Sequence, residues 1–328
     1  MATRSLVQAI HDGLAEEMRA DETVMVMGED VGRAGGVFRV TEGLQQEFGP
    51  YRALDTPLAE SLIVGAAIGL AANGMKPVAE IQFADFIPPA FDQIVSEAAR
   101  FRYRSNNAWN CQITVRAPYG HIPGGALYHS QSVEAWFCNV PGLKVVAPTY
   151  PADAKGLLKA AIRDPDPVIF FEHKKAYRLL KQEVPENDYT VPLRKAKVHR
   201  EGTDMTVVSY GVMLHLVLEA AEKLAGEHGI EVEVVEPLTL YPLDKATILE
   251  SARKTGKFLV VSEANLEGSV SGEIASIVAE EAFEWLDGPV MRLGAPNVPG
   301  IPFAKPLMDW YVPDLERIQG KMLELARY

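Results

Sequence analysis

The sequence predicts an α/β protein of two doubly wound domains, in which helices cover both faces of parallel sheets. Short apolar, β-rich runs alternate with helix-length segments along the chain, which is typical of parallel strands joined by helical crossovers. The length of 328 residues also exceeds that of one ordinary domain. A stretch rich in charged residues and proline interrupts the alternation. We therefore expect domains at residues 1–185 and 203–328, with 186–202 as a linker.

The elements of the first predicted domain follow from its apolar pattern. It opens on an amphipathic helix with Leu6, Ile10 and Leu14 on one face. Buried strands are expected at Val24–Met27, Val78–Phe83, Ile113–Val115, Leu143–Ala147 and Val168–Phe171. Helices are expected at Leu62–Ala71, Pro89–Arg104 and Ala152–Ile162.

The second predicted domain repeats this alternation. Its strands are expected at Thr206–Tyr210, Glu231–Val235 and Phe258–Ser262. Its helices are expected at Leu214–Ala225, Ser271–Glu284 and Arg317–Ala326. The segment Gly294–Pro306 is rich in proline and glycine, so it is predicted to be an ordered loop.

Composition excludes several classes of function. A net charge of −12 argues against the nucleic-acid backbone as a partner, because phosphate binding needs clustered Lys and Arg. The basic run Arg100–Arg104 is better explained as a helix end or a subunit contact. Cys111 and Cys138 are the only cysteines, so neither a zinc site nor a disulfide framework is indicated. The start of the chain has no targeting pattern, and the apolar run Leu62–Ala72 is too short to span a bilayer. We expect a cytoplasmic protein with no membrane partner.

The segment Asp55–Glu60 places a carboxylate at the start of an apolar helix. Thr56 can cap that helix, Pro57 suits its first position, and Glu60 then falls in the first turn. A carboxyl group on a nearly all-apolar helix is costly to bury without a partner, so Glu60 is a candidate functional acid. The alternative is a helix-start glutamate that is favoured by the helix dipole.

Further segments combine polar and aromatic residues at predicted strand ends. Gly28–Val31 has two acids after a buried strand, and Glu80–Phe86 has an amide, two aromatic rings and two acids. Gly124–Ser132 is a glycine-containing loop that carries His129. Each segment has a purely structural alternative, such as a strand end or a polar loop. Their joint occurrence indicates a ligand site, because open α/β sheets bind ligands at the carboxyl ends of their strands.

These motifs resemble those of the β subunits of the E1 component of 2-oxoacid dehydrogenase complexes, which are thiamine-diphosphate-dependent decarboxylases. The resemblance runs from end to end and is most specific in G-E-D-V-G, D-T-P-L-A-E, E-I-Q-F-A-D-F, Y-H-S-Q-S and D-A-K-G-L-L. It implies a pyrimidine-binding domain of the transketolase type, followed by a transketolase C-terminal-like domain. The stretches Gly125–Ser132, Arg102–Asn106 and Phe171–Lys174 are most similar to branched-chain members. Pyruvate-specific and acetoin-specific members share most of the scaffold.

The resemblance implies a role for each motif residue. Glu60 is expected to hydrogen-bond N1′ of the cofactor's aminopyrimidine, and Phe86 to stack on that ring. His129 is expected at the entrance, where it binds the substrate carboxylate or passes the acyl group to the lipoyl group of the E2 acyltransferase. For its role Glu60 must hold or share a proton, which requires Leu58, Leu62 and Ile63 to bury its carboxyl group. Further pocket members are expected to be Glu29, Gln82 and the backbone of Leu58.

The resemblance also implies ions and a partner. A structural monovalent cation, such as K⁺, is expected on backbone oxygens near Ile113, Ala161, Asp164 and Asp166. The chain lacks the Gly-Asp-Gly motif with which thiamine enzymes hold Mg²⁺ and the diphosphate. An E1 α subunit is therefore expected to supply Mg²⁺ binding in an α₂β₂ heterotetramer.

Two alternatives remain open. A transketolase or deoxyxylulose-phosphate synthase would carry Gly-Asp-Gly on the same chain, so its absence argues against that class. A non-catalytic subunit of the same fold is disfavoured because Glu60, Phe86 and His129 occur together.

Overall fold

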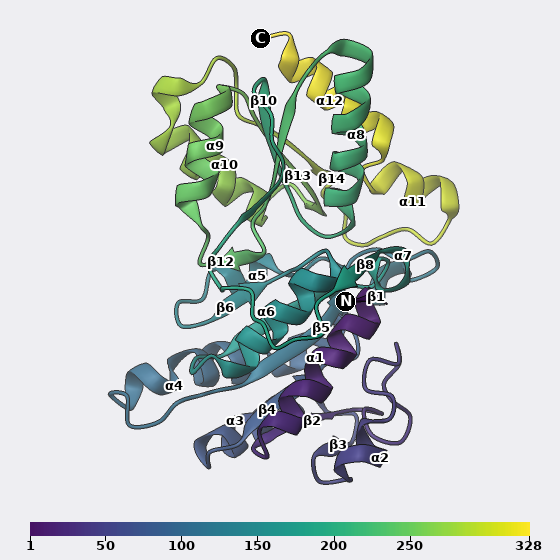
Figure 1. The fold of residues 1–328 in the computed structure, drawn as a ribbon, viewed down its shortest axis with the longest axis vertical. Coiled ribbons are helices and arrows are strands. Elements are labelled where there is room, and N and C mark those ends of the chain that lie inside the picture. Colours follow the sequence, from purple (N-terminus) through teal and green to yellow (C-terminus); the bar gives the residue numbers. More distant parts are fainter. The chain divides into compact units, whose positions relative to one another are not determined.

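The computed structural model describes residues 1–328 (Figure 1). The chain forms two compact units. The first comprises residues 1–119 and 136–193, and the second comprises residues 120–135 and 194–328. Each unit contains parallel strands with packed helices, which confirms the predicted α/β class. No helix combines the length and apolar character that a membrane crossing requires.

A parallel sheet organises the first unit. Its strands are β2 (Val24–Gly28), β3 (Ala53–Asp55), β4 (Lys76–Glu80), β5 (Thr114–Tyr119), β6 (Lys144–Val146) and β7 (Val168–His173). They lie in the order β6-β7-β5-β4-β2-β3, and all neighbouring pairs are parallel. A separate antiparallel pair joins β1 (Ala2–Ser5) to β8 (Lys181–Val184). The strands β2, β5 and β7 are buried throughout, which explains why apolar residues predominate in them.

The first helix of the first unit, α1, has a side-chain cap at its start. The α-helices are α1 (Leu6–Ala20), α2 (Leu44–Phe48), α3 (Glu60–Ala72), α4 (Ala99–Arg104), α5 (Ala135–Cys138), α6 (Pro151–Arg163) and α7 (Ala176–Leu179). Ser5 and Gln8 form a capping box at the start of α1. The apolar face of α1 is buried as predicted, and α1 lies beside α6 (Figure 1). Lys159 of α6 pairs with Glu16 of α1 at 2.8 Å.

The segment predicted as a helix at Pro89–Arg104 is helical throughout, but it is not one uniform α-helix. It contains most of the 3₁₀ turn η2 (Pro88–Ala90), the π-helical segment η3 (Gln93–Ala98) and α4. Pro88 and Pro89 lack backbone N–H groups, and the π-helical hydrogen bonds change the spacing of the turns that follow. The strand predicted to reach Phe83 ends at Glu80, which pairs with Gly28 at the end of β2. The 3₁₀ turn η1 (Ala84–Phe86) follows.

The second unit has a five-stranded sheet. Its strands are β9 (Lys197–Arg200), β10 (Met205–Ser209), β11 (Val232–Glu236), β13 (Phe258–Asn265) and β14 (Met291–Ala295), in the order β14-β13-β10-β11-β9. The edge strand β9 is antiparallel to β11, and the other pairs are parallel. A short strand, β12 (Thr239–Tyr241), follows β11. The strand β9 falls within the interval 186–202 that we expected to be a linker.

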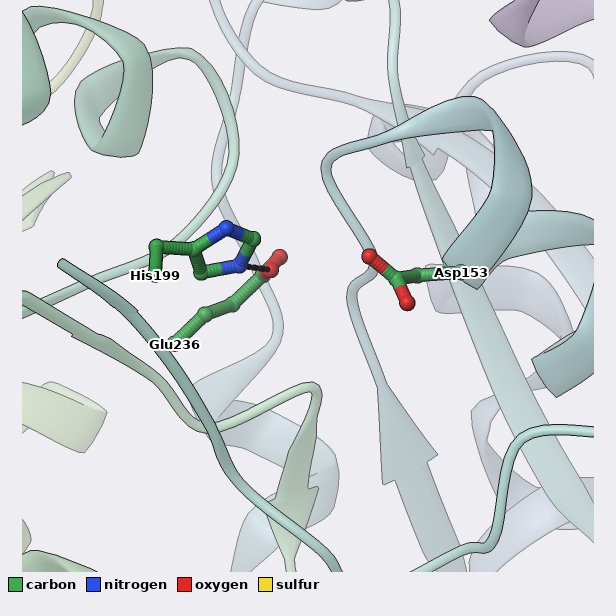
Figure 2. A group of neighbouring side chains, drawn as sticks. All are labelled: Asp153, His199 and Glu236. Carbon is green, nitrogen blue, oxygen red and sulfur yellow. Dashed lines mark hydrogen bonds and ion pairs between the residues drawn. The ribbon is translucent and has the colours of Figure 1, made fainter. Parts of the chain in front are cut away.

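Helices lie on both sides of this second sheet. They are α8 (Val212–His228), α9 (Lys245–Thr255), α10 (Val270–Glu281), α11 (Lys305–Tyr311) and α12 (Leu315–Ala326), with 3₁₀ turns η4 (Ala126–Tyr128) and η5 (Phe283–Trp285). In Figure 1, α8 and α12 lie on one side of β10 and β13, and α9 and α10 lie on the other. His199 of β9 and Glu236 of β11 form a hydrogen bond of 2.6 Å, which joins the edge strand to its neighbour (Figure 2).

Candidate functional site

Three strand ends of the first unit bring the predicted cofactor residues to one edge. Because β2 lies between β3 and β4, Gly28 pairs with both Asp55 and Glu80. The backbone is tight here, since a Cβ atom on Gly28 would lie 2.7 Å from the carbonyl oxygen of Glu80. The chain segments that follow these strand ends carry Glu29, Leu58, Glu60, Gln82 and Phe86.

Glu60 is the first residue of α3, which confirms its predicted position in the first helical turn. The predicted cap is wrong, because the residue before the helix is Ala59 and no side chain caps it. The N–H of Thr56 donates to the carbonyl of Gly28 at 2.9 Å. This bond extends the β2–β3 pairing, so the chain is still extended where a Thr56 cap would have to start the helix.

The carboxyl group of Glu60 is only partly covered by its own chain. Ile63 is buried with 2% of its surface exposed, but Leu58 and Leu62 are 69% and 51% exposed. The expectation that all three residues bury Glu60 is therefore wrong for this chain by itself. An apolar surface stands open beside the acid at the start of α3.

Glu29 lies close enough to Glu60 for their charges to interact. Burial raises the pKa of Glu29, and the negative charges of Asp30 and Glu60 raise it further. The charge of Glu60 thus adds to the proton affinity of Glu29.

Aromatic rings pack together in the segment that follows β4. Phe86 lies in η1 and meets Phe83 edge to face, with their ring centroids 5.5 Å apart. Phe83 in turn contacts Phe38 at 5.4 Å and lies 5.5 Å from the ammonium nitrogen of Lys174. Phe86 is half-buried, so its ring is held by neighbours while part of its surface stays accessible.

A buried ionic cluster supports the same strand ends. The guanidinium of Arg116 on β5 donates two hydrogen bonds, of 2.6 and 2.7 Å, to Glu172 on β7 and another to Glu80 on β4. The hydroxyl of Tyr177 donates to Glu172 at 2.5 Å. Burial raises the pKa of Glu80, against the opposing attraction of Arg116.

We did not select this cluster from the sequence. Its signal is a charged residue in each of three mostly apolar strands, Glu80, Arg116 and Glu172, because charges that are buried there need partners. The cluster joins β4, β5 and β7 at their carboxyl ends. It therefore holds the edge from which Gln82 and Phe86 extend.

The residues expected near a monovalent cation form a compact group. The carbonyl of Ile113 accepts from the N–H of Val168 at 3.0 Å, and that of Ala161 accepts from the N–H of Asp164 at 3.2 Å. Lys144 bonds both carboxylates, Asp164 and Asp166. Although burial opposes ionisation, hydrogen bonds from Arg102 and Lys144 hold the pKa of Asp166 below its usual value. The carboxylates are thus neutralised by the protein's own cations, which leaves backbone oxygens as the donors that suit a cation.

His129 belongs to the second unit, within the segment 120–135. It follows η4 and is partly exposed. The other expected site residues all lie in the first unit.

Comparisons with known proteins identify two types of domain along the chain. Residues 2–179 match the transketolase pyrimidine-binding domain, and residues 194–318 match the transketolase C-terminal domain. The 2-oxoisovalerate dehydrogenase subunit beta of Bacillus subtilis (strain 168) is 55% identical over 328 residues, covering 100% of both chains. The pyruvate dehydrogenase E1 component subunit beta of the same strain is 47% identical, covering 94% of this chain and 95% of that one.

A solved structure also supports the fold. A split gene transketolase, described as an inactive beta4 tetramer, superposes with a TM-score of 0.80 at 24% identity, covering 99% of this chain and 98% of that one. The sequence-based family prediction is confirmed by the relatives. This chain belongs to the family of 2-oxoacid dehydrogenase E1 β subunits, built from transketolase-type pyrimidine-binding and C-terminal domains.

Proposed function

We propose that this chain is the β subunit of an E1 enzyme that decarboxylates a branched-chain 2-oxoacid with thiamine diphosphate and reductively acylates the lipoyl group of E2. The observation that carries the proposal is that Glu29, Glu60 and Phe86 all follow the carboxyl ends of the neighbouring parallel strands β2, β3 and β4. The branched-chain preference is supported by the 55% identical relative that is named for 2-oxoisovalerate.

The residues at this edge fit the pyrimidine half of thiamine diphosphate. A carboxyl group at the first turn of α3 can share a proton with a ring nitrogen, and the accessible part of Phe86 offers a flat face for stacking. Gln82 adds an amide with both donor and acceptor atoms. When bound, the cofactor supplies the carbon nucleophile and the electron sink that decarboxylation needs.

Glu60 holds or shares a proton at the ring nitrogen N1′ in this proposal. Glu29 assists because its carboxyl group has a raised pKa and lies within electrostatic reach of Glu60. The backbone of Leu58 is a further member of the pocket in this proposal. His129 binds the substrate carboxylate or assists transfer of the acyl group to the lipoyl arm.

The proposed enzyme needs a second polypeptide. The chain has no Gly-Asp-Gly motif for Mg²⁺ and diphosphate, and the exposed Leu58 and Leu62 leave an apolar surface open beside Glu60. An E1 α subunit that covers this surface would bury Glu60 and supply the Mg²⁺ ligands. The assembly is then α₂β₂, and the C-terminal domain is the proposed platform for E2.

A monovalent cation such as K⁺ is also proposed in the first unit. Its donors would be the backbone oxygens near Ile113 and the Ala161–Asp166 turn. The neighbouring Thr114 has a buried hydroxyl oxygen with no hydrogen-bond partner, which supports a role for further oxygen ligands here.

Reconstitution tests the proposal. The purified chain is expected to be inactive alone and to turn over 3-methyl-2-oxobutanoate faster than pyruvate once an E1 α subunit, thiamine diphosphate and Mg²⁺ are added. Glu60→Gln should abolish that turnover without unfolding the chain, whereas Glu22→Gln, at an exposed position, should not. Decarboxylation retained by Glu60→Gln contradicts the role of Glu60, and a preference for pyruvate supports the alternative of a pyruvate dehydrogenase subunit.

A further inference from the structure

The segment 120–135 is tied to the strand ends of the second sheet. It leaves the first unit after β5 and returns to it in α5, yet it belongs to the second unit. The strands β10 and β13 are parallel neighbours, with Ser209 paired to Val261. Two acceptor–donor pairs at their carboxyl ends hold the segment.

Both ends of the segment are held by buried groups. Near the start, the backbone N–H of His121 donates to the carboxylate of Glu263 on β13. Near the end, Glu134 accepts a 2.7 Å hydrogen bond from the hydroxyl of Tyr210, the residue that follows β10. All four residues are buried. Each contact stabilises this path of the segment, because a buried carboxylate that loses its hydrogen-bond donor destabilises the fold.

The segment is also closed upon itself. The N–H of Gly120 donates to the carbonyl of Gln131 at 3.0 Å. The hydroxyl of Ser130 bonds both the N–H and the carbonyl of Ile122, each at 3.3 Å. A Cβ atom on Gly125 would lie 2.2 Å from the Ser130 hydroxyl, so this turn has no room for a larger residue. His129 sits directly beside this closure.

The tip of the segment packs on the same unit. A Cβ atom on Gly300 would lie 1.8 Å from the side chain of Leu127, which shows how closely that side chain approaches the loop after β14. The segment is therefore held at both ends and at its tip. His129 lies between Leu127 and Glu134 in the sequence, so it is bracketed by two of these contacts.

We propose that Tyr210, Glu134 and Glu263 are positioning residues for His129. Open α/β sheets bind ligands at the carboxyl ends of their strands. In the second unit, the ends of β10 and β13 hold the His129 segment instead. The C-terminal domain thus acts in the reaction by presenting His129, and this inference rests on the proposed catalytic use of that histidine.

The electrostatics of Glu134 agree with a positioning role. Burial raises its pKa to about 6, the Tyr210 hydrogen bond opposes the rise, and the charge of Glu263 adds to it. Tyr311 also faces Glu263, and its pKa is raised by burial and by that carboxylate. Above pH 6 the buried, ionised Glu134 depends on the Tyr210 hydroxyl, because its second oxygen has no hydrogen-bond partner.

Hydrogen exchange and kinetics of the reconstituted α and β holoenzyme test the proposal. Tyr210→Phe should raise amide exchange in residues 120–135 and lower kcat for 3-methyl-2-oxobutanoate, each by roughly tenfold. Tyr189→Phe is the matched control, because it removes a hydroxyl that donates at 2.8 Å to Ala152 within the first unit. Glu134→Ala should match Tyr210→Phe, whereas Glu134→Gln keeps an acceptor and should restore both readouts to within about twofold of wild type.

A double-mutant cycle shows whether the effect acts through His129. Tyr210→Phe should lower kcat no further when His129 is already Ala, because the residue that it positions is gone. Losses that multiply in the double variant overturn the proposal, as does unchanged exchange in residues 120–135. If His129→Ala alone leaves kcat unchanged, the proposed use of His129 fails instead, while the exchange measurement still reports on the tether.

Discussion

The hydroxyl of Tyr210 donates a 2.7 Å hydrogen bond to Glu134, a residue 76 positions earlier in the chain. Both residues belong to the second unit, and the bond holds the segment 120–135 at a strand end of that unit. Because the carboxyl group is buried and only one of its oxygens is bonded, its ionisation affects stability.

Glu134 should make the folded protein less stable as pH rises from about 4.5 to 6. Its pKa is raised from 4.5 to about 6 in the folded state, so the folded chain binds the proton more tightly than the unfolded chain. The stabilisation is complete below pH 4.5 and lost above pH 6, and amounts to about 2 kcal/mol. The free-energy difference between Glu134→Gln and wild type in urea unfolding should grow by that amount over this interval. The exposed Glu22→Gln is the control. If the free-energy difference for Glu134→Gln changes no more with pH than the one for Glu22→Gln, the raised pKa of Glu134 is contradicted.

Arg116 should be essential to the stability of the first unit. Arg116→Met leaves the carboxyl groups of Glu80 and Glu172 buried without their guanidinium partner, at an expected cost of about 3–5 kcal/mol in urea unfolding. Adding Glu80→Gln and Glu172→Gln should recover part of the loss. The control Lys305→Ala breaks an exposed pair with Asp309 and should cost less than about 1 kcal/mol. If Arg116→Met and Lys305→Ala lower the free energy of unfolding by similar amounts, burial does not make the Arg116 cluster more important than an exposed ion pair.

Phe86 should contribute to cofactor affinity more than to folding. Phe86→Ala removes the ring that contacts Phe83 and presents an accessible face at the proposed site. Aromatic stacking of this kind corresponds to roughly a tenfold loss of affinity. Calorimetric titration of the reconstituted enzyme with thiamine diphosphate measures it. Phe303→Ala, at an exposed ring of the second unit, is the control and should leave affinity unchanged.

Glu60→Gln should lower the pKa of Glu29. The charges of Asp30 and Glu60 both raise that pKa, and Asp30 has the larger effect. Asp30→Asn should therefore lower it more than Glu60→Gln does. Carboxyl ¹³C chemical shifts of the isolated chain, followed through a pH titration, measure both changes. If Glu60→Gln leaves the titration of Glu29 unchanged, the charge of Glu60 does not act on Glu29 and the prediction is contradicted.

Much of the fold could be predicted because its signals are local. The buried strand β7 begins with the apolar run Val168–Phe171, and α1 has apolar residues at helical spacing, so both follow from neighbouring residues. Glu60 also falls in the first helical turn, as predicted. The family resemblance was available from short motifs, and the comparisons confirm it.

Other features depend on which strands become neighbours. The Thr56 cap does not form because the N–H of Thr56 donates to Gly28, 28 residues earlier, and so extends the pairing with β2. Helix-capping rules consider only residues that are near in sequence. The Arg116 cluster forms only because β5 lies between β4 and β7. Neither arrangement can be inferred from local periodicity.

The sequence by itself determined the class of fold, the family and the acid at the start of α3, since each is encoded in a short stretch of chain. Only the tertiary structure decided that the His129 segment belongs to the second unit. Its ties to Tyr210 and Glu263 join residues 76 and 142 positions apart. Such contacts depend on how sheets and loops pack, and that packing is a property of the whole folded chain.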